Sequence, residues 1–559
     1  MNDDRHWLNI LSGALADGRP VSRTFGFERG RPIDRLYIDT FLAGQAAAVR
    51  GRVLEVGDDG YTRRYGGTAV ERADVLHASG EGATNAIVSD LAAGAPEIAS
   101  GTYDCIIFTQ TLHVIHDIRA VLETLRRILK AGGTLLATMP GITPVSRYDM
   151  DRWGDHWRLT GCSARKLFEA VFIGDAVDVT GFGNPVAATA FLNGLAVEDM
   201  PGGSLDPIDP DYEVTVAVAV RKALLPAKPR SGAAARAVVL MYHRIAALET
   251  DPQLLAVRPD RFRNHLAGLR GVGTPVPLAR VAEGLRGGEL PERAIAVTFD
   301  DGYADNLETA KPLLEAAGIP ATVFVTTGPL GSAGEYWWDE LERLILLPER
   351  LPAALRMTVG GRPVSADLAG NAAPERSAGT REWSVADADT PTPRHALYRA
   401  LHAALLALDD PDEVERVLLA LARWAGCPLR GREGYRPLDG DGVRTLAAGG
   451  LVEVGAHTVS HPNLGRLSIA RQRDEIRQSR GRLEAILGQP VRSFAYPFGN
   501  SGSFDAGTLA LLHAEGFSNA VTTRSDPVRD GDHPLLIPRL CVRDWPAGEL
   551  VSRIARWLG

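Results

Sequence analysis

Short apolar runs and amphipathic segments alternate along the first 220 residues of the chain. Residues 52–56 and 103–108 are apolar runs with the length of buried strands, and residues 118–129 place apolar side chains at helical spacing. Residues 134–138 form the next apolar run, after a pair of glycines that is expected to end the helix. Alternating strands and helices predict a parallel sheet, so residues 1–222 are expected to form a Rossmann-like, doubly wound α/β domain.

The next segment, residues 223–236, has no apolar periodicity and is rich in proline and alanine, which predicts a linker. Beyond it, apolar runs alternate with helical patterns again. Repeated strand–helix units predict a (β/α) barrel over residues 237–559, with its chemistry at the carboxyl ends of the strands. The apolar runs are residues 237–242, 294–299, 321–326, 451–455, 491–495, 517–523 and 535–542.

The barrel pattern is interrupted at about residues 334–436. Residues 348–393 have no periodicity and are predicted to be irregular, whereas helical spacing returns at residues 398–408 and 413–425. We therefore expect a helical insertion within one catalytic domain. Its first residues include the triplet Tyr-Trp-Trp at residues 336–338, which can either stack on a sugar or pack the insertion against the barrel.

Composition and charge exclude several classes of protein. Acidic residues number 69 against 61 Lys and Arg, a net charge of -8, so a sustained basic face for nucleic acid is not expected. No apolar stretch reaches the ~20 residues of a membrane-spanning helix, and the first residues lack the apolar core of a secretory signal. The 4 cysteines show no metal-binding spacing. We therefore expect a cytoplasmic protein with reduced thiols and no transmembrane segment, while its oligomeric state stays open.

Chemically active side chains follow two of the predicted strands. Asp300 and Asp301 directly follow the second apolar run of the barrel pattern, and His457 and His461 follow the fourth. Two adjacent carboxylates are costly to bury because like charges in one pocket resist joint ionisation. Two imidazoles four residues apart can face one ion if the chain turns between them. Carboxylate and neutral imidazole together suit Zn²⁺ or another divalent first-row metal.

Three motifs of this region resemble the polysaccharide deacetylase family, carbohydrate esterase family 4. They are Thr-Phe-Asp-Asp-Gly at residues 298–302, His-Thr-Val-Ser-His at residues 457–461 and Phe-Ala-Tyr-Pro-Phe-Gly at residues 494–499. The resemblance spans roughly residues 237–559. It implies a distorted (β/α) barrel that hydrolyses the acetamide group of N-acetylglucosamine-type residues, so the partner is an N-acetylated sugar or glycan.

Carried over position by position, the resemblance assigns a role to each motif residue. Asp301, His457 and His461 bind a divalent metal, with zinc as the expected ion, and Asp300 is the general base. The backbone N–H of Tyr496 stabilises the oxyanion. These residue types also suit amide hydrolysis without the resemblance, because a metal activates water and a neighbouring carboxylate takes the proton of that water.

The general acid is not assigned by this resemblance. The family usually places a histidine at the end of its last strand, but here that strand offers Arg539, and His533 lies before the strand. Either His243 donates the proton, or Asp300 returns its captured proton to the leaving amine. Arg539 is then free to pair with Asp300 instead of acting on the substrate.

The first half of the chain resembles the class I S-adenosylmethionine-dependent methyltransferases over roughly residues 30–220. The matching motifs are Val-Leu-Glu-Val-Gly at residues 53–57, Tyr-Asp at residues 103–104, Leu-His at residues 112–113 and Leu-Lys-Ala-Gly-Gly at residues 129–133. The resemblance implies S-adenosylmethionine as a cofactor, with Asp74 at the ribose hydroxyls and Asp90 at the adenine amino group. Either carboxylate can instead cap a loop. The implied cofactor loop contains Glu55, Gly57 and Gly60.

The cofactor loop also departs from the family pattern. Asp59 and Tyr61 occupy positions where the family has glycine. Glycine permits positive φ and brings no side chain toward a ligand, and the carboxylate of Asp59 is expected to repel that of the cofactor. The two histidines of the segment 113–116 fit packing at a strand-to-helix turn better than a metal site, because no further ligand lies close in sequence.

The sequence therefore predicts a metal-dependent N-deacetylase of an N-acetylated sugar, oligosaccharide or glycan precursor, fused to a domain for S-adenosylmethionine-dependent methyl transfer. The alternative is a single-activity deacetylase whose N-terminal domain is a degenerate cofactor-binding or scaffold domain. A sugar-binding module with an inactive barrel is disfavoured, because Asp300, Asp301 and both motif histidines are intact.

Overall fold

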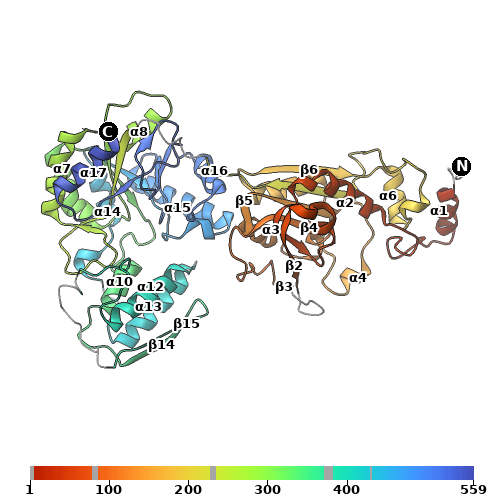
Figure 1. Ribbon diagram of the computed structural model, residues 1–559, viewed down its shortest axis with the longest axis horizontal. Coiled ribbons are helices and arrows are strands. Elements are labelled where there is room, and N and C mark those ends of the chain that lie inside the picture. Colours follow the sequence, from red (N-terminus) through yellow and green to blue (C-terminus); the bar gives the residue numbers. More distant parts are fainter. Residues whose placement is uncertain are drawn as a thin grey trace. The chain divides into compact units, whose positions relative to one another are not determined.

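The computed structural model describes residues 6–78, 86–226, 235–369, 380, 382–408, 410–428 and 431–559. They form two compact units (Figure 1). The first unit contains nearly all of the chain up to Leu225, and the second unit contains nearly all of the remaining residues. Residues 227–234, the greater part of the predicted linker, lie outside the described residues.

The first unit is built on one sheet. Its strands are β1 (Gly51–Val56), β2 (Val70–His77), β3 (Ile87–Val88), β4 (Tyr103–Thr109), β5 (Leu129–Pro140), β6 (Ala176–Phe182) and β7 (Thr215–Arg221). The order is β3-β2-β1-β4-β5-β7-β6, and all neighbours are parallel except β7, which is antiparallel to β5 and β6. The predicted Rossmann-like, doubly wound sheet is confirmed. Its order reverses between β1 and β4, where ligands of such sheets bind beyond the carboxyl ends of the strands.

Helices alternate with these strands. They are α1 (His6–Ala16), α2 (Ile33–Gly44), α3 (Ile118–Ile128), α4 (Arg147–Met150), α5 (Gly161–Val171) and α6 (Pro185–Leu192). The predicted end of α3 at Gly132 is wrong, because β5 already begins at Leu129. Tyr103 pairs with Leu129 and Cys105 with Thr134, so β5 bulges near Gly132, whose φ of 80° is a conformation that glycine tolerates.

The second unit contains a curved sheet. Its strands are β8 (Ala235–Tyr242), β11 (Thr274–Pro275), β12 (Ala294–Phe299), β13 (Ala321–Val325), β16 (Val452–Ala456), β17 (Ser493–Ala495), β18 (Asn519–Val521), β19 (Val528–Arg529) and β20 (Leu540–Cys541). The series β18-β17-β16-β13-β12-β8 is parallel throughout. Ile537 bridges to Val521 of β18, and β20 pairs with β8, so this last segment joins the two ends of the series. This curved parallel sheet, whose two ends are joined by the last segment, confirms the predicted distorted barrel.

Helices connect the strands of the barrel. They are α7 (Pro259–Val272), α8 (Leu278–Leu285), α9 (Lys311–Ala317), α14 (Gly440–Ala447), α15 (Ile469–Leu487), α16 (Ala506–Ala514) and α17 (Ala547–Leu558), with a short pair β9 (Arg244–Ile245) and β10 (Ala256–Val257) after β8. Gly318, at a φ of 60°, ends α9 in the left-handed conformation. Because β12 and β16 are parallel and flank β13, the loops that follow them open on the same face.

The insertion lies between β13 and β16. It contains α10 (Trp337–Ile345), β14 (Ala354–Val359), β15 (Arg362–Asp367), α12 (Pro393–Leu406) and α13 (Pro411–Ala425), which gather in one green-to-teal part of Figure 1. It has its own apolar core, which includes Leu344, Leu401 and Leu421. The prediction of an irregular stretch is wrong where β14 and β15 form a hairpin. Gly360 and Gly361, both at positive φ, make its two-residue turn.

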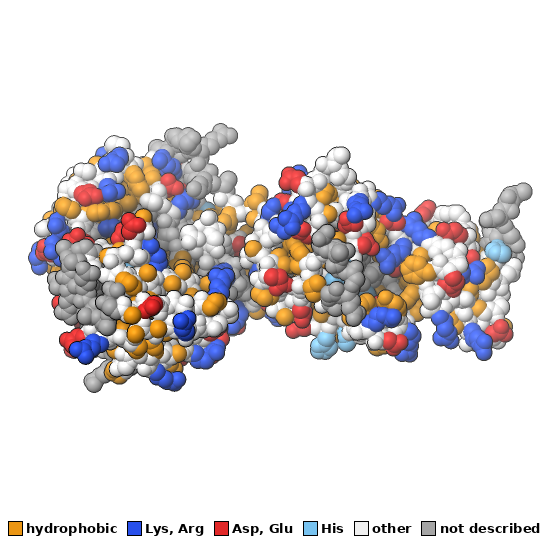
Figure 2. Space-filling view, turned by 60° about the horizontal axis from the view of Figure 1, so that its bottom comes forward, with side chains coloured by type: hydrophobic (Ala, Val, Ile, Leu, Met, Phe, Trp, Pro, Cys, Tyr) orange, Lys and Arg blue, Asp and Glu red, His pale blue; other side chains and the backbone are white. Residues whose placement is uncertain are grey.

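The surface carries charges of both signs. Figure 2 shows Lys and Arg side chains interspersed with Asp and Glu side chains over the face that it displays. None of the described helices combines the length and the apolarity that a membrane span requires.

Candidate functional site

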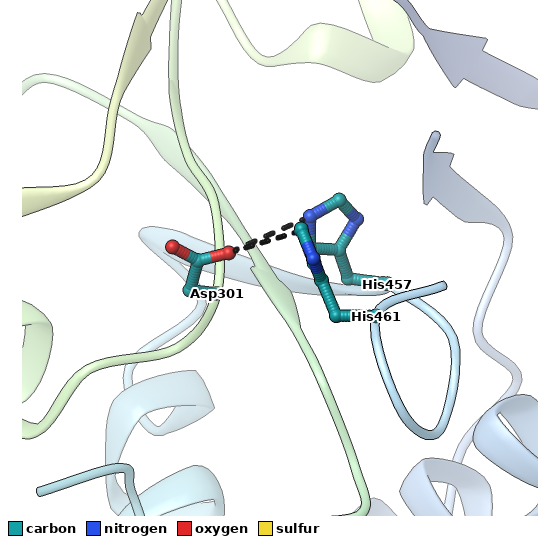
Figure 3. Close-up of side chains that lie close together, drawn as sticks. All are labelled: Asp301, His457 and His461. Atoms are coloured by element: carbon teal, nitrogen blue, oxygen red, sulfur yellow. Dashed lines mark ion pairs between the residues drawn. The ribbon is translucent and has the colours of Figure 1, made fainter. Parts of the chain in front are cut away.

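Three side chains meet at the carboxyl ends of the barrel strands. Asp301 follows β12, and His457 and His461 follow β16 (Figure 3). The Oδ1 atom of Asp301 lies 3.7 Å from Nε2 of His457 and 3.5 Å from Nε2 of His461. One ligand atom from each residue lies within 4.8 Å of the other two. Donor atoms ~2.0–2.2 Å from one zinc ion are about 3–4 Å apart, so the spacing suits a shared ion.

The backbone is constrained where these side chains leave it. Asp301, Thr458 and His461 have φ values of 75°, 65° and 58°, a region that side-chain-bearing residues rarely occupy. The carbonyl of Asp301 accepts hydrogen bonds from the hydroxyl of Tyr336 at 2.5 Å and from the N–H of Thr326 at 3.1 Å. Such strain persists only where the surroundings hold it, which is typical of functional sites.

A carboxylate of α15 stabilises the loop that carries His457 and His461. Glu475 accepts hydrogen bonds from the N–H groups of Val459 and Ser460, at 2.8 and 3.0 Å, and from the hydroxyl of Ser460 at 2.7 Å. His457 uses Nδ1 to contact the carbonyl of Ala495 at 2.8 Å, which leaves Nε2 directed at Asp301. These contacts fix the ring orientation of His457, as partners of metal-binding histidines do.

The charge states of the three residues also fit a cation. Burial lowers the pKa of His457, and burial together with His457 lowers the pKa of His461 well below its usual range, so both rings stay neutral. Burial and the carboxylates of Asp300 and Asp339 raise the pKa of Asp301 well above its usual range. A carboxylate in this position is stabilised as an anion only by a nearby positive charge. Two neutral nitrogens and one oxygen are a donor set for Zn²⁺.

Asp300 has a different partner. Its two carboxylate oxygens each lie 2.6 Å from a guanidinium nitrogen of Arg539. Burial alone raises the pKa of Asp300, but Arg539 outweighs burial and lowers that pKa to about 2. Arg539 also donates to the carbonyl of Thr522 at 2.9 Å and to the hydroxyl of Thr298 at 3.1 Å. Arg539 is therefore a positioning residue for an ionised Asp300, and the predicted pairing of the two is confirmed.

The backbone N–H of Tyr496, the predicted oxyanion donor, is already hydrogen-bonded in this structure. Its N–H donates to the carbonyl of Val521 at 3.2 Å, and its hydroxyl donates to the carbonyl of Leu535 at 2.9 Å. Backbone hydrogen bonds to the β18 segment continue past the end of β17, since the N–H of Thr523 donates to the carbonyl of Gly499 at 3.0 Å. Phe498, at a φ of 59°, does line the cavity, and its N–H makes no hydrogen bond to another described residue.

A cavity of about 390 Å³ opens over these groups. His243, which follows β8, lines it, and burial lowers the pKa of His243 to about 4. His402 of α12 reaches the same cavity from the insertion, a contribution for which the sequence holds no motif. The other lining residues are Met241, Gln253, Leu255, Asp300, Asp301, Trp337, Trp338, His457, His461, Phe498, Thr523, Cys541 and Arg543.

Two residues of the aromatic triplet take the predicted packing role. Tyr336 and Trp338 are buried, and their rings stack at 4.9 Å. The ring of Trp338 also meets that of His461 edge-on at 5.2 Å, so these two residues pack the insertion against the candidate metal ligands. Trp337 is only partly buried and lines the cavity.

The loop after β1 in the first unit keeps part of the expected cofactor geometry. Glu55 is buried and accepts hydrogen bonds from the N–H groups of Tyr61 and Thr62, at 3.1 and 2.7 Å. Gly57 has a φ of 88°, and a side chain there would meet open space. The N–H of Gly60 bonds within the loop, to Asp58 at 2.7 Å. The backbone can thus approach a ligand at Gly57.

Asp59 and the two carboxylates assigned to the nucleoside are engaged elsewhere. Asp59 pairs with Arg63 at 2.7 Å. Asp74 lies inside β2 and not after it, which corrects its expected position at the ribose; it pairs with Arg52 at 2.7 Å and Arg72 at 2.8 Å. Asp90 accepts a hydrogen bond from the N–H of Ala92 at 2.8 Å, as a loop-capping carboxylate does.

The two histidines after β4 form no metal cluster. His113 is buried, and the ring of His116 packs against the rings of His156 and Trp157 at 5.6 and 6.2 Å. Within the described part of the chain, the group formed by Asp301 and its two histidines is the only one of three or more metal-binding side chains.

Two family models match the chain. Residues 287–346 and 422–520 match the polysaccharide deacetylase family, and residues 30–183 match the methyltransferase domain family. Over 97 residues the chain is 36% identical to the poly-beta-1,6-N-acetyl-D-glucosamine N-deacetylase of Escherichia coli K12, a stretch covering 17% of this chain and 14% of that protein. The matched stretch thus spans only a small part of the curated relative.

Solved structures of both kinds align with the chain. The deacetylase PplD of Streptococcus pyogenes aligns with 59% of this chain and 99% of its own, at 18% identity and a TM-score of 0.36. An S-adenosylmethionine-dependent methyltransferase of Archaeoglobus fulgidus aligns with 34% of this chain and 90% of its own, at 13% identity and a TM-score of 0.24. Along the chain, a match to the methyltransferase domain family is thus followed by a match to the polysaccharide deacetylase family.

Proposed function

We propose that the barrel is a metal-dependent N-deacetylase of N-acetylglucosamine-type residues in a glycan or glycan precursor. The observation that carries the proposal is the convergence of Asp301, His457 and His461 beside the ionised Asp300. The named substrate of the Escherichia coli relative, an N-acetylglucosamine polymer, supports this class of sugar. The cytoplasmic location predicted from the sequence stays a prediction.

The metal is held by Asp301, His457 and His461 in this proposal, and zinc is the preferred ion for a site with two imidazoles and one carboxylate. A divalent ion bound there supplies a more acidic water and polarises the acetyl carbonyl. Buried Tyr336 supports the backbone of Asp301, because its hydroxyl donates to the carbonyl of Asp301.

The remaining residues supply the proton transfers. Asp300 accepts the proton of the attacking water, and Arg539 keeps it ionised and oriented. The N–H of Phe498 is the donor best placed to bond the oxyanion, because it lines the cavity without another partner among the described residues. His243 protonates the amine nitrogen as the C–N bond breaks, and acetate and the free amine are then released. Since burial keeps His243 neutral, it must first receive the proton that Asp300 captured.

Acetate release tests this proposal. The purified chain is incubated with β-1,6-linked N-acetylglucosamine oligomers and, separately, with nucleotide-linked N-acetyl sugars, after reconstitution with zinc. We expect acetate from at least one of these classes and none from the His457→Gln variant, which lacks one metal-binding nitrogen. Metal-loaded wild-type protein that releases no acetate from either class would contradict the proposed activity.

For the first unit we propose that S-adenosylmethionine binds at the switch point between β1 and β4. The open, left-handed backbone at Gly57 favours this site, and the pairing of Asp59 with Arg63 removes the expected repulsion. Asp74 is not available to the ribose, so that contact must come from another residue. A scaffold domain without a cofactor is the alternative, and equilibrium dialysis of the full chain against S-adenosylmethionine distinguishes the two.

A further inference from the structure

A second cavity lies in the methyltransferase domain, outside the site described above. It has a volume of about 500 Å³, within the usual range for small-molecule sites. Gln110, which follows β4, and Pro140, the last residue of β5, line it. It therefore opens at the carboxyl edge of the sheet, while no residue of the loop from Glu55 to Gly60 lines it. The cavity is distinct from the proposed cofactor loop.

The walls of this cavity are net positive. Arg23, Arg35, Arg147 and Arg158 line it against only two carboxylates. Arg158 is neutralised by Asp155, to which it donates two hydrogen bonds of 2.5 and 2.7 Å.

The other three guanidiniums are less fully engaged. Arg35 donates to the hydroxyl of Tyr61 at 3.2 Å. Arg23 and Arg147 form no ion pair with any other described residue. Two unpaired guanidiniums at one cavity are suited to bind a carboxylate or a phosphate, because their forked donors match the geometry of these anions.

Two buried polar atoms of the same walls have no partner among the described residues. They are Nδ1 of His113, whose side chain is buried, and Oδ1 of Asp34. Buried polar atoms are nearly always hydrogen-bonded, so such atoms beside a cavity point to a ligand that completes them. A carboxylate oxygen needs a donor, and a neutral imidazole nitrogen can donate or accept. Hydroxyl groups meet both requirements.

Aromatic rings complete the site. Phe25, Phe27 and Tyr148 also line the cavity, and Phe27 and Tyr148 are 59% and 61% exposed. The exposed ring of Phe27 offers flat apolar surface of the kind that covers the C–H face of a sugar ring, whereas the guanidinium of Arg152 already stacks on the ring of Tyr148 at 3.7 Å. The cavity thus combines an anion site, paired hydroxyl partners and flat apolar walls.

We infer that this cavity binds a sugar that carries one negatively charged group, either a carboxylate or a phosphate. The anionic group lies at Arg23 and Arg147, and the ring hydroxyls pair with Asp34 and His113. Within the proposed methyl transfer this ligand is the methyl acceptor. That last clause rests on the proposed function of the domain, whereas binding of the sugar does not.

Isothermal titration of the full chain, without S-adenosylmethionine, tests the inference. The probes are glucuronic acid, glucose 6-phosphate, glucose and inorganic phosphate. We expect one of the charged sugars to bind, and the comparison of glucuronic acid with glucose 6-phosphate identifies the anion. Glucose that binds as tightly as both charged sugars, inorganic phosphate that binds as tightly as glucose 6-phosphate, or no binding by either charged sugar would overturn the inference.

Variants locate the binding. Arg147→Gln is expected to weaken binding of the charged sugar roughly ten- to hundredfold, because a hydrogen bond to a charged group is lost. His113→Gln is expected to weaken it by a smaller factor. Arg165→Gln is the matched control, since Arg165 is an exposed arginine of α5 that donates to the carbonyl of Val177 at 3.2 Å and does not line the cavity. Equal affinities of the Arg147 and Arg165 variants, with unchanged melting temperatures, would place the sugar elsewhere and overturn the inference.

A separate titration with S-adenosylmethionine keeps this result distinct from the proposed cofactor site. Sugar binding without cofactor binding refutes the proposed methyl transfer and leaves the inferred sugar site standing. Cofactor binding without sugar binding refutes the inferred site alone.

Discussion

Arg539 and Asp300 form a buried ion pair in which both nitrogen–oxygen distances are 2.6 Å. The neighbouring carboxylate, Asp301, instead faces two histidines. Arg539 lowers the pKa of Asp300 to about 2 against the opposite effect of burial, while burial and Asp300 raise the pKa of Asp301 well above its usual range. Two adjacent carboxylates with different environments can therefore take different roles, one as a base and one as a metal ligand.

Removal of Arg539 is expected to shift the acidic limb of the pH–rate profile. In Arg539→Met, burial acts on Asp300 without the opposing guanidinium, so its pKa rises and the protonated, inactive form persists to higher pH. The acidic limb of kcat/KM for acetate release therefore moves to higher pH. Arg539→Lys keeps a positive charge and should shift the limb less. An acidic limb that is the same in wild type and Arg539→Met would show that Arg539 does not control Asp300.

The same pair should contribute to stability. Because the folded-state pKa of Asp300 is depressed, its contribution is fully present above the unfolded pKa of ~3.9 and is lost as the pH falls toward about 2. Breaking a buried pair by removing one partner costs ~3–5 kcal/mol. Urea unfolding of Arg539→Met at neutral pH should show a loss of that order, and a loss below about 1 kcal/mol would contradict the buried pairing.

Asp300→Asn should separate base catalysis from metal binding. The amide has the same shape but cannot accept the proton of water, so acetate release should fall by ~10²–10⁴-fold. Bound zinc, measured by atomic emission after dialysis, should stay at the wild-type level. Loss of zinc from this variant would make Asp300 a ligand and not the base.

Tyr336→Phe should weaken metal binding although Tyr336 contacts no metal-binding atom. Its hydroxyl bonds the carbonyl of Asp301, whose φ is 75°. Loss of a supporting contact of this kind typically costs 10–100-fold in metal affinity. Competition with a chelating dye measures the affinity. Tyr398→Phe is the matched control, because that buried hydroxyl bonds Gln253 within the same insertion-facing region and does not bond Asp301. Equal zinc affinities of the two variants would contradict the role of Tyr336.

The cofactor loop yields a prediction about Asp59. Because Asp59 pairs with Arg63, an exposed partner, Asp59→Gly should change S-adenosylmethionine affinity by less than about fivefold. Gly57→Val should abolish binding, because its φ of 88° disfavours a branched side chain and the added atoms enter open space that a ligand needs. A large gain of affinity in Asp59→Gly would show that the aspartate faces the cofactor after all.

Much of the barrel site follows from local sequence. The apolar run before Asp300 and Asp301 becomes β12, and the run before His457 becomes β16. Parallel strands bring the residues after them to one edge of the sheet. Asp301 and His457, 156 positions apart in the chain, are therefore expected to lie together from the sequence pattern alone. The charge pairing of Asp300 with Arg539 is predictable for the same reason.

Other features depend on contacts that sequence does not encode locally. Whether the N–H of Tyr496 is free depends on how far the ladder between β17 and β18 extends, and the structure uses it for Val521. Asp74, which the resemblance places at the ribose, lies inside β2, because that strand continues past it to His77. His402 reaches the cavity because α12 folds back from the insertion, and no motif marks that packing.

The central claim is that Asp301, His457 and His461 hold one ion that deacetylation requires. The most direct measurement is acetate release by the chelated protein as zinc is added back, in wild type and in Asp301→Asn. We expect wild-type activity to be lost on chelation and to return at one equivalent of zinc, while Asp301→Asn neither retains the ion nor recovers. Full wild-type activity after complete removal of metal, or recovery of Asp301→Asn at one equivalent of zinc, would contradict it.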